Sequence, residues 1–388
     1  MKRRILLIVG NMESGGVSKS MSSLLNVIDT NKYEVDCFIL VPKGIFMHNI
    51  PSPIRLIDDK RTSLIAERYF TSIRGLLRNG YLFDGLLRTV AAFFMLFNKG
   101  IGGWILSRRI KKINKEYDLA VDFNGQLQLY YLIDRIYAKK KVTFIHSDYA
   151  KWDYYYSMDK KYMPKADKIF TISKQCVQSL KRYFPECHSK IELFENISSP
   201  VLIKEKANET PDSSFDFDGV RLLTIGHVSE NKGTDIAIKA ANILKQRGFD
   251  FHWYFIGLNT APELFKQMIN ENNVKDKITF MGIKANPYPY IQQADIVVHP
   301  SRFEGKSIAL DEAKILAKPI VVTSFSTVND QFENRVNASI CEMNELALAN
   351  AIEELLMDTS LRDRYTRALS QTNLDNTGEI NKLYQLLN

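Results

Sequence analysis

The sequence predicts an α/β protein built from two Rossmann-like domains that face each other across a cleft. Short apolar runs of β type alternate with helical patterns in both halves of the chain, which favours parallel sheets. A polar segment broken by Pro and Gly separates the halves, and a length of 388 residues suits two domains. Because ligands bind beyond the carboxyl ends of parallel strands, the expected site lies where the two domains meet.

The first domain is expected over residues 1–200, with a polar linker over 201–218 and the second domain over 219–374. The candidate strands of the first domain are residues 4–10, 35–41, 119–123, 141–146 and 168–173. Those of the second domain are residues 220–228, 251–257, 277–282, 294–300 and 319–323. Each is a short apolar run bounded by polar or turn-forming residues, which is typical of a buried strand.

Charge and cysteine content narrow the classes of function. Residues 1–200 carry 32 Lys and Arg against 19 Asp and Glu, a net charge of +13, whereas residues 201–388 carry 20 against 25, a net −5. A basic domain suits nucleic acid, anionic lipid or a phosphorylated substrate. Four scattered cysteines without a CxxC pair argue against a zinc site or a disulfide scaffold and suit a reducing cytosol. The most apolar run, residues 89–97, is too short to span a bilayer.

The stretch IVGNMESGGVSKS, residues 8–20, has the strand–turn–helix layout of an anion-binding loop. It is not a nucleoside-triphosphatase P-loop, because Gly16 and Val17 stand where that motif has Lys and Ser or Thr. It also lacks the spacing of the dinucleotide fingerprint. The tandem Gly15-Gly16 therefore indicates either a phosphate-facing turn or a tight turn that packs a helix on a sheet.

Two motifs in the second half carry the strongest chemical signal. In FEGKSIALDEA, residues 303–313, Glu304 and Glu312 stand eight apart, and a helix starting near Ser307 would present its N-terminus to an anion. In GHVSENKG, residues 226–233, Lys232 is placed to neutralise a phosphate. The alternatives are a capped amphipathic helix with a solvated carboxylate and a solvated loop lysine.

These motifs resemble those of family 4 glycosyltransferases, which have the GT-B fold. GHVSENKG is similar to their G-R-L-x-x-x-K-G loop and FEGKSIALDEA to their E-x₇-E segment, and the GG turn and a strand ending in His146 follow the same order. The resemblance covers nearly the whole chain. It implies an N-terminal acceptor-binding domain, a C-terminal nucleotide-sugar domain, and a closing segment, residues 375–388, that crosses back to the first domain. It also implies sugar transfer with retention of configuration, without a metal or other cofactor.

The resemblance implies catalytic roles for His146, Glu304 and Lys232. Lys232 would hold the donor diphosphate, Glu304 the donor sugar and Glu312 the ribose hydroxyls, while His146 would lie near the transferred sugar. The implied donor-binding residues are Gly15, Gly16, His227, Lys232, Glu304, Gly305, Lys306, Ser307, Ile308 and Glu312. Among them, the backbone N–H groups of residues 306–308 would contact the phosphates.

One departure from the family pattern concerns the first residue after Gly226. His227 replaces the usual arginine, and histidine offers neither a permanent charge nor a fork of donors. Either Lys232 and the helix N-terminus suffice, or Arg302 or Lys306 compensates. The string Asp216-Phe217-Asp218 matches the D-x-D of metal-dependent transferases, but it falls in the expected linker and is interpreted as chance.

Residues 82–112 combine apolar side chains at helical spacing with Arg108, Arg109, Lys111 and Lys112. This pattern suits a helix lying on an anionic membrane, and ordinary core packing is the alternative. With the family's habits, it favours a polyprenyl-diphosphate-linked saccharide acceptor. The nucleotide base is not marked by any motif, and a UDP-sugar is the default donor; no nucleic-acid partner is expected. The expected setting is capsule, exopolysaccharide or O-antigen synthesis, at the inner face of the cell membrane.

Two other functions remain open. A sugar-nucleotide epimerase could share the fold and the donor site but needs no acceptor. A relative that only binds membrane or nucleic acid would suit the basic first half, although binding alone does not require Glu304, Lys232 and His146 together. Glu304→Ala separates the classes, because it should abolish transfer and leave such binding unchanged.

Overall fold

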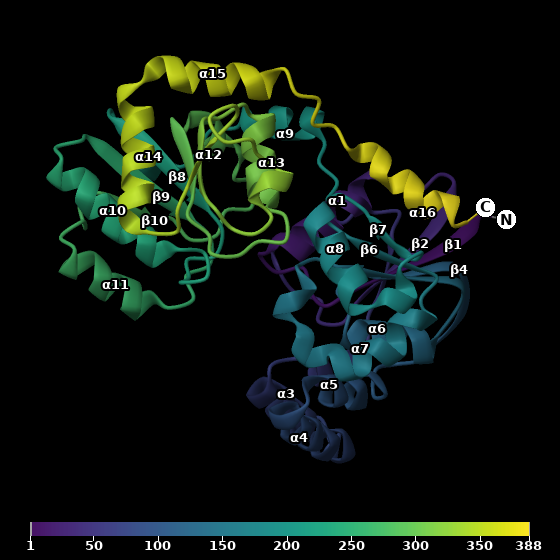
Figure 1. The fold of residues 1–388 in the computed structure, drawn as a ribbon. Helices are drawn as coiled ribbons and strands as arrows, with labels where there is room; N and C mark the ends of the chain where they lie inside the picture. Colours follow the sequence, from purple (N-terminus) through teal and green to yellow (C-terminus); the bar gives the residue numbers. More distant parts are fainter. Residues whose placement is uncertain (1, 388) are drawn as a thin grey trace. The chain divides into compact units, whose positions relative to one another are not determined.

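The computed structural model of the chain describes residues 2–387 and divides into two units, each with its own parallel sheet (Figure 1). The first unit comprises Met1–Ile197 and Thr377–Asn388, and the second comprises Ser198–Asn376. The predicted fold class, two Rossmann-like α/β domains, is confirmed for the sheets of both units.

The first unit contains a seven-stranded sheet in the order β3-β2-β1-β4-β5-β6-β7, in which every neighbouring pair is parallel. In β1, Ile5, Leu7 and Val9 enter one core cluster, whereas Leu6 and Ile8 enter another. Both faces are therefore buried, which explains why β1 is a continuous apolar run and not an alternating one. The strands are β1 (Arg3–Val9), β2 (Tyr33–Ile39), β3 (Arg55–Ile57), β4 (Ile113–Asp122), β5 (Ile136–Ile145), β6 (Lys168–Thr171) and β7 (Ile191–Leu193).

The helices of the first unit include one that comes from the end of the chain. In α16, Tyr384 stacks on Tyr33 with ring centroids 4.7 Å apart, and its hydroxyl accepts a hydrogen bond from Asp29 N at 2.8 Å. Leu383 and Leu387 join the core that contains β1. The helices are α1 (Gly16–Val27), α2 (Lys60–Ala66), α3 (Tyr69–Arg78), α4 (Leu82–Phe97), α5 (Lys99–Ser107), α6 (Leu127–Arg135), α7 (Tyr156–Tyr162), α8 (Lys174–Tyr183) and α16 (Asn381–Gln385).

The second unit contains a six-stranded parallel sheet in the order β10-β9-β8-β11-β12-β13. Its strands are β8 (Val220–Ile225), β9 (Phe251–Ile256), β10 (Ile278–Phe280), β11 (Ile296–His299), β12 (Ile320–Thr323) and β13 (Ser339–Cys341). Its helices are α9 (Pro200–Ala207), α10 (Thr234–Gln246), α11 (Pro262–Glu271), α12 (Tyr288–Gln293), α13 (Ile308–Ile315), α14 (Glu345–Met357) and α15 (Thr359–Ser370).

The strand order of each sheet determines where a ligand can bind. In the first sheet, β1 lies between β2 and β4, and in the second, β8 lies between β9 and β11. The order reverses at these strands, so the loops that leave their carboxyl ends diverge and open a crevice. The loops after β8 and β11 contain residues 226–233 and 300–307, which are the two motifs of the second half.

The prediction of a linker at residues 201–218 is wrong, because this segment belongs to the second unit. Pro200–Ala207 form α9, in which Ser199 caps the helix by accepting a hydrogen bond from Leu202 N and Pro200 occupies the first turn. Ile203 and Phe215 are buried in a core of the second unit. The segment is polar overall, but its few apolar residues recur at positions that pack on this unit.

Candidate active site

The central contact of the second unit joins its two motifs. Lys232 lies in the loop between β8 and α10, and Glu304 lies in the loop between β11 and α13. Lys232 Nζ is 2.5 Å from Glu304 Oε1, although the residues are 72 positions apart in sequence. The fold therefore brings these two predicted residues together at the point where the strand order reverses, which is the usual ligand position in such sheets.

Glu304 is a buried carboxylate with two basic partners. Its Oε1 also lies 2.7 Å from His299 Nε2, at the carboxyl end of β11. Burial alone would raise the pKa of Glu304, but the charge of Lys232 and the hydrogen bond with His299 outweigh it and lower the pKa to about 2. Glu304 is therefore ionised at neutral pH and neutralises the charge of Lys232.

Gly233 allows the Lys232 loop to pack closely on the Glu304 loop. Its φ is 70°, in the left-handed region, and a Cβ built there would stand 1.8 Å from the carbonyl oxygen of Pro300. Arg302 N also donates to the carbonyl of Asn231 at 3.0 Å. Backbone contacts thus fix the position of Lys232 relative to Glu304.

The N-terminus of α13 already has a side-chain partner. Ser307 N donates to Gln331 Oε1 at 3.0 Å, and Gln331 Nε2 donates to Ser307 O and Asp311 Oδ1, each at 3.0 Å. Ile308, which begins the helix, is buried. A phosphate at this helix end would therefore share or displace the contact between Gln331 and the Ser307 N–H.

Glu312 is not the solvated carboxylate of the alternative interpretation. It is 1% exposed, and it forms a hydrogen bond with Tyr288 of α12. Burial and the neighbouring Glu312 carboxylate raise the pKa of the Tyr288 hydroxyl well above its usual range. The pair places a carboxylate and a phenol on the side of α13 that faces the core of the unit.

The cations that were expected to compensate for His227 are both paired with aspartates. Arg302 forms a bidentate ion pair with Asp235, with nitrogen–oxygen distances of 2.6 and 2.7 Å. Lys306 Nζ lies 3.5 Å from Asp311 Oδ2. His227 itself is half-buried beside Gly226. The histidine that contacts Glu304 is instead His299, which the sequence motifs did not single out.

In the first unit, the predicted residues follow two strands of one sheet. Gly15 and Gly16 lie at the start of α1, where a Cβ on either glycine would meet no atom within 4 Å. A glycine is favoured at position 15 because the backbone there has a φ of 150°, and not because a Cβ would collide with a neighbouring atom. The turn after β1 is thus open at the GG pair, which distinguishes it from the tightly packed turn at Gly233.

His146 follows β5 and packs on aromatic rings. Its ring centroid is 4.7 Å from that of Phe123 and 5.8 Å from that of Phe144. Burial lowers the pKa of His146 to about 4, although a hydrogen bond with the backbone of Phe123 partly opposes this. Among the residues that the structure describes, Nε2 has no hydrogen-bond partner. His146 is therefore neutral at pH 7, and its Nε2 is a buried nitrogen whose hydrogen-bonding capacity no described residue uses.

A buried aspartate of the same sheet was missed from the sequence. Asp122 ends β4 and accepts hydrogen bonds from Thr143 Oγ1 at 2.6 Å, Asn124 N at 2.9 Å and Gly125 N at 3.0 Å. Burial raises its pKa to about 7, against the effect of these hydrogen bonds. Four residues after Asp122, Gln126 has a φ of 48°, which a non-glycine residue rarely adopts. Asp122 thus holds a strained loop at the strand-order reversal of the first sheet.

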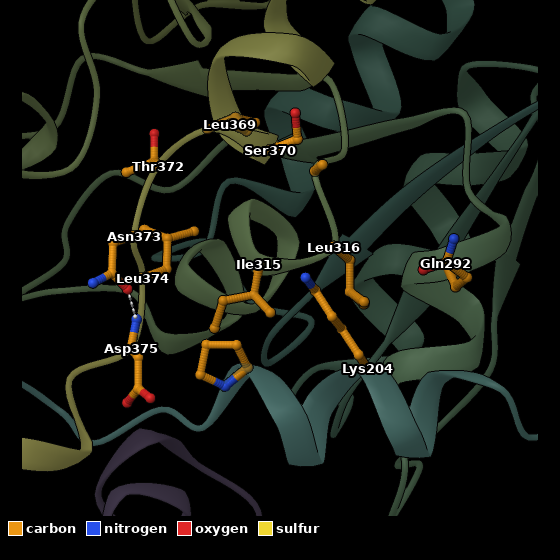
Figure 2. Close-up of a pocket in the computed structure, with 12 residues that line it drawn as sticks. Lys204, Gln292, Ile315, Leu316, Leu369, Ser370, Thr372, Asn373, Leu374 and Asp375 are labelled. Carbon is orange, nitrogen blue, oxygen red and sulfur yellow. Dashed lines mark hydrogen bonds between the residues drawn. The ribbon is translucent and has the colours of Figure 1, made fainter.

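The second unit also contains a pocket, which is shown in Figure 2. It has a volume of about 420 Å³, and no predicted site residue lines it. Lys204 of α9 and Ile315 of α13 border it, and Asp375 N donates to Asn373 Oδ1 at 3.1 Å on its rim. Its lining consists of Pro200, Lys204, Gln292, Ile315, Leu316, Ala317, Leu369, Ser370, Thr372, Asn373, Leu374 and Asp375.

Residues 206–371, which include the Lys232–Glu304 pair, match the family described as Glycosyl transferases group 1. The chain contains a glycosyl transferases group 1 domain. Alpha-D-kanosaminyltransferase of Streptomyces kanamyceticus is 27% identical to it over 146 residues, 37% of this chain and 38% of that protein. A second relative of the group 1 domain is N-acetylgalactosamine-N,N'-diacetylbacillosaminyl-diphospho-undecaprenol 4-alpha-N-acetylgalactosaminyltransferase of Campylobacter jejuni. It is 26% identical over 204 residues, 52% of this chain and 54% of that protein.

Solved structures extend the likeness of the group 1 domain to the whole fold. Anabaena Alr3699/HepE in complex with UDP-glucose is 14% identical, with a TM-score of 0.71 over 99% of each chain. WaaG, a glycosyltransferase involved in lipopolysaccharide biosynthesis, is 13% identical, with a TM-score of 0.66 over 99% of each chain. The fold is therefore GT-B, as the motifs indicated. The chain spans between about a third and about half of the length of the curated relatives that it matches.

Proposed function

We propose that the protein is a retaining, metal-independent glycosyltransferase. It transfers a sugar from a nucleoside-diphosphate sugar, with UDP-sugars favoured, to a lipid-linked saccharide in bacterial capsule, exopolysaccharide or O-antigen synthesis. The contact between Lys232 and Glu304 carries this proposal, because it joins a cation and a carboxylate within the group 1 domain at the ligand-binding edge of the sheet.

The chemistry of the leaving group explains the pair. As the bond between the sugar and the diphosphate breaks, negative charge grows on the departing phosphate, and a fixed cation beside it stabilises the transition state. Lys232 is the cation of this site, and Glu304 forms an ion pair with it. We expect the diphosphate to draw Lys232 toward itself, while Glu304 stays held by His299 and turns its other oxygen to hydroxyls of the donor sugar.

The proposed donor and acceptor are supported by relatives and by the first unit. HepE binds UDP-glucose, and the name of the Campylobacter jejuni relative describes a diphospho-undecaprenol acceptor. In the first unit, Nε2 of the neutral His146 ring can accept a hydrogen bond from a sugar hydroxyl without attracting the diphosphate. The GG turn has room for a ligand atom close to the backbone.

The proposal is tested by thermal denaturation with a panel of uridine, guanosine and adenosine diphosphate sugars in EDTA. We expect one base class to raise Tm by several degrees, since a ligand at a hundred times Kd adds about 2.7 kcal/mol of stability. Lys232→Ala should remove the shift. Lys266→Ala removes an exposed lysine of α11 and should keep it.

Transfer itself is tested by supplying the stabilising donor with a polyprenyl-diphosphate-linked saccharide. Glu304→Ala should abolish product formation. Release of an altered nucleotide sugar without acceptor would instead indicate an epimerase. A chain that binds no donor in the panel, with or without acceptor, would contradict the proposal.

A further inference from the structure

The helices α3 and α4 expose an unusual number of large apolar side chains. Phe70 is 85% exposed, Leu96 is 79% exposed and Phe97 is 76% exposed. The exposed apolar side chains of the two helices are Phe70, Leu77, Leu82, Phe83, Leu86, Phe93, Phe94, Leu96 and Phe97. Figure 1 shows α3, α4 and α5 grouped at the end of the first unit that lies away from α16. Soluble monomers rarely leave so large an apolar surface in water unless it binds something.

The two sides of α4 show that this surface is not part of the core. Asp84, Gly85, Arg88 and Ala91 are buried, so they form the inner side of the helix. Leu82, Leu86, Phe93 and Phe97 recur at helical spacing on the opposite side and face solvent. A surface helix normally carries polar residues there. Ordinary core packing, the alternative interpretation of this stretch, is therefore wrong for these residues.

The same surface carries positive charge and no exposed carboxylate. Arg68, Arg74, Arg78 and Lys99 are exposed around the apolar side chains. On α3, Phe70, Arg74 and Arg78 follow one another at intervals of four and share one face. The acidic residue of 68–99 is Asp84, which is buried and paired with Arg61 and Arg109 at 2.6 and 2.8 Å.

Three of the four cations that the sequence suggested form ion pairs, and the fourth, the exposed Lys112, donates a hydrogen bond to Tyr137 Oη at 2.7 Å. Arg109 holds Asp84, Arg108 lies 3.4 Å from Asp134, and Lys111 lies 3.8 Å from Asp59. These residues serve ion pairs within the first unit. Arg74 and Arg78 are instead the side chains that can contact an anionic surface, because neither forms an ion pair with any of the residues 2–387.

We propose that α3 and α4, together the α3–α4 surface, dock the protein on an anionic lipid bilayer. Apolar side chains enter the headgroup boundary, and the arginines contact lipid phosphates. In the part of the chain that the structure describes, no helix is both long and apolar enough to cross a bilayer. The 16 residues of α4 therefore lie along the interface. This inference rests on the proposed function for its purpose, since a lipid-linked acceptor is reached at a membrane.

Charge favours a bilayer over a second copy of the chain. A twofold dimer through the α3–α4 surface would place this surface against itself. Arg74 and Arg78 of both copies would then meet without a carboxylate to neutralise them, which costs binding free energy. An anionic bilayer supplies both the apolar interior and the opposite charge.

Co-sedimentation of the full chain with vesicles tests the inference. We expect binding to vesicles of phosphatidylcholine with about 30% phosphatidylglycerol, in line with polybasic and apolar anchoring, and much weaker binding to pure phosphatidylcholine. The variant Leu82→Ser/Phe93→Ser/Phe97→Ser should lower the partition constant at least tenfold. Arg74→Gln/Arg78→Gln should lower it about tenfold or more, since each arginine near the surface contributes about 1 kcal/mol.

Two matched controls use exposed side chains of the second unit. Val201→Ser/Met357→Ser removes apolar residues that are 76% and 73% exposed, and Lys266→Gln/Lys275→Gln removes two exposed lysines. Both should bind vesicles like the wild type. The Tm shift with the donor sugar should be unchanged in all four variants, which separates failure of docking from failure of the donor site.

Three results would overturn the inference. The wild-type chain could fail to bind the anionic vesicles. Binding could be equal in the variants of the α3–α4 surface and in the controls. Finally, sedimentation could reveal a dimer that the triple serine variant dissociates, which would make a second copy the occupant of this surface.

Discussion

Nε2 of His299 lies 2.7 Å from Oε1 of Glu304, the same oxygen that Lys232 reaches. His299 is 4% exposed and lies at the carboxyl end of β11, so Glu304 is held by a buried residue of a strand. The carboxylate therefore keeps one partner when an anionic ligand recruits Lys232. This makes His299 a positioning residue for Glu304.

Replacement of His299 should cost stability and donor binding together. In His299→Ala, the buried carboxylate loses a hydrogen-bond partner, and we expect the free energy of unfolding to fall by about 1–3 kcal/mol. His299→Gln keeps a donor and should recover part of the loss. Urea denaturation measures the first effect and nucleotide-sugar titration the second. Equal stability of the alanine variant and the wild type would show that the contact does not hold Glu304.

The stability supplied by Glu304 should disappear in acid. Its pKa of about 2 in the folded chain is below the ordinary value of 4.5, so the folded state favours the ionised form. This contribution is complete above pH 4.5 and is lost as the pH falls through 2. We expect the difference in free energy of unfolding between the wild type and Glu304→Gln to shrink over this range. A difference that stays constant from pH 5 to 2 would contradict the ionised pair.

A methyl group at Gly233 should disrupt the site more than one at Gly248. Both glycines have left-handed φ values, 70° and 82°, which cost alanine about 1–2 kcal/mol. At Gly233 the Cβ also collides with the backbone of Pro300, whereas at Gly248 it meets no atom within 4 Å. Gly233→Ala should therefore be less stable than Gly248→Ala by about 1–3 kcal/mol.

The two glycine variants also differ in their expected effect on the donor. Gly233→Ala should lose the Tm shift with the nucleotide sugar, because Lys232 moves away from the β11 loop. Gly248→Ala should keep the full shift, although its own Tm is lower. Thermal denaturation with and without donor measures both effects, and matching losses in the two variants would exclude the steric explanation.

His146 should destabilise the fold as the pH falls. Burial lowers its pKa to about 4 from 6.5, so between these values the unfolded chain takes up a proton that the folded chain does not. By linkage, His146 does not reduce the free energy of unfolding above pH 6.5, and that free energy decreases as the pH falls from 6.5 to 4. Compared with His146→Asn, which does not titrate, the wild type should lose stability over this interval. Chemical denaturation at several pH values measures it, and parallel curves would show that His146 is solvated.

Long, buried strands were predictable from the sequence, whereas of the three-residue edge strands only β10 was expected, at residues 277–282. The runs at β1, β2, β8, β9 and β11 are apolar because both faces of each sheet are covered. The strands β3, β7 and β13 have three residues each and lie at sheet edges. In these three segments so short a run carries no readable periodicity, and pairing with a neighbouring strand defines them. The Ser199-Pro200 start signal of α9 was present but was outweighed by the polar composition around it.

The site was predictable only where the chemistry lies in a motif. Lys232 and Glu304 stand in recognisable loops, and their contact follows from the strand order. Asp122 and Gln331 were missed, because their partners come from other elements and no local spacing marks them. The pairing of Arg302 with Asp235 depends on the same kind of long-range approach. The roles of the predicted residues in catalysis stay predictions until the variants are measured.

The position of α16 has a consequence for how the protein is made. The first unit is formed by segments on both sides of Ser198–Asn376, and Ile380, Leu383 and Leu387 of its core are synthesised after that whole stretch. The whole of Ser198–Asn376 is synthesised before these side chains exist, so the first unit cannot complete its core until the second unit has been made. Premature termination after residue 376 would thus spare the later-made unit and damage the one made first.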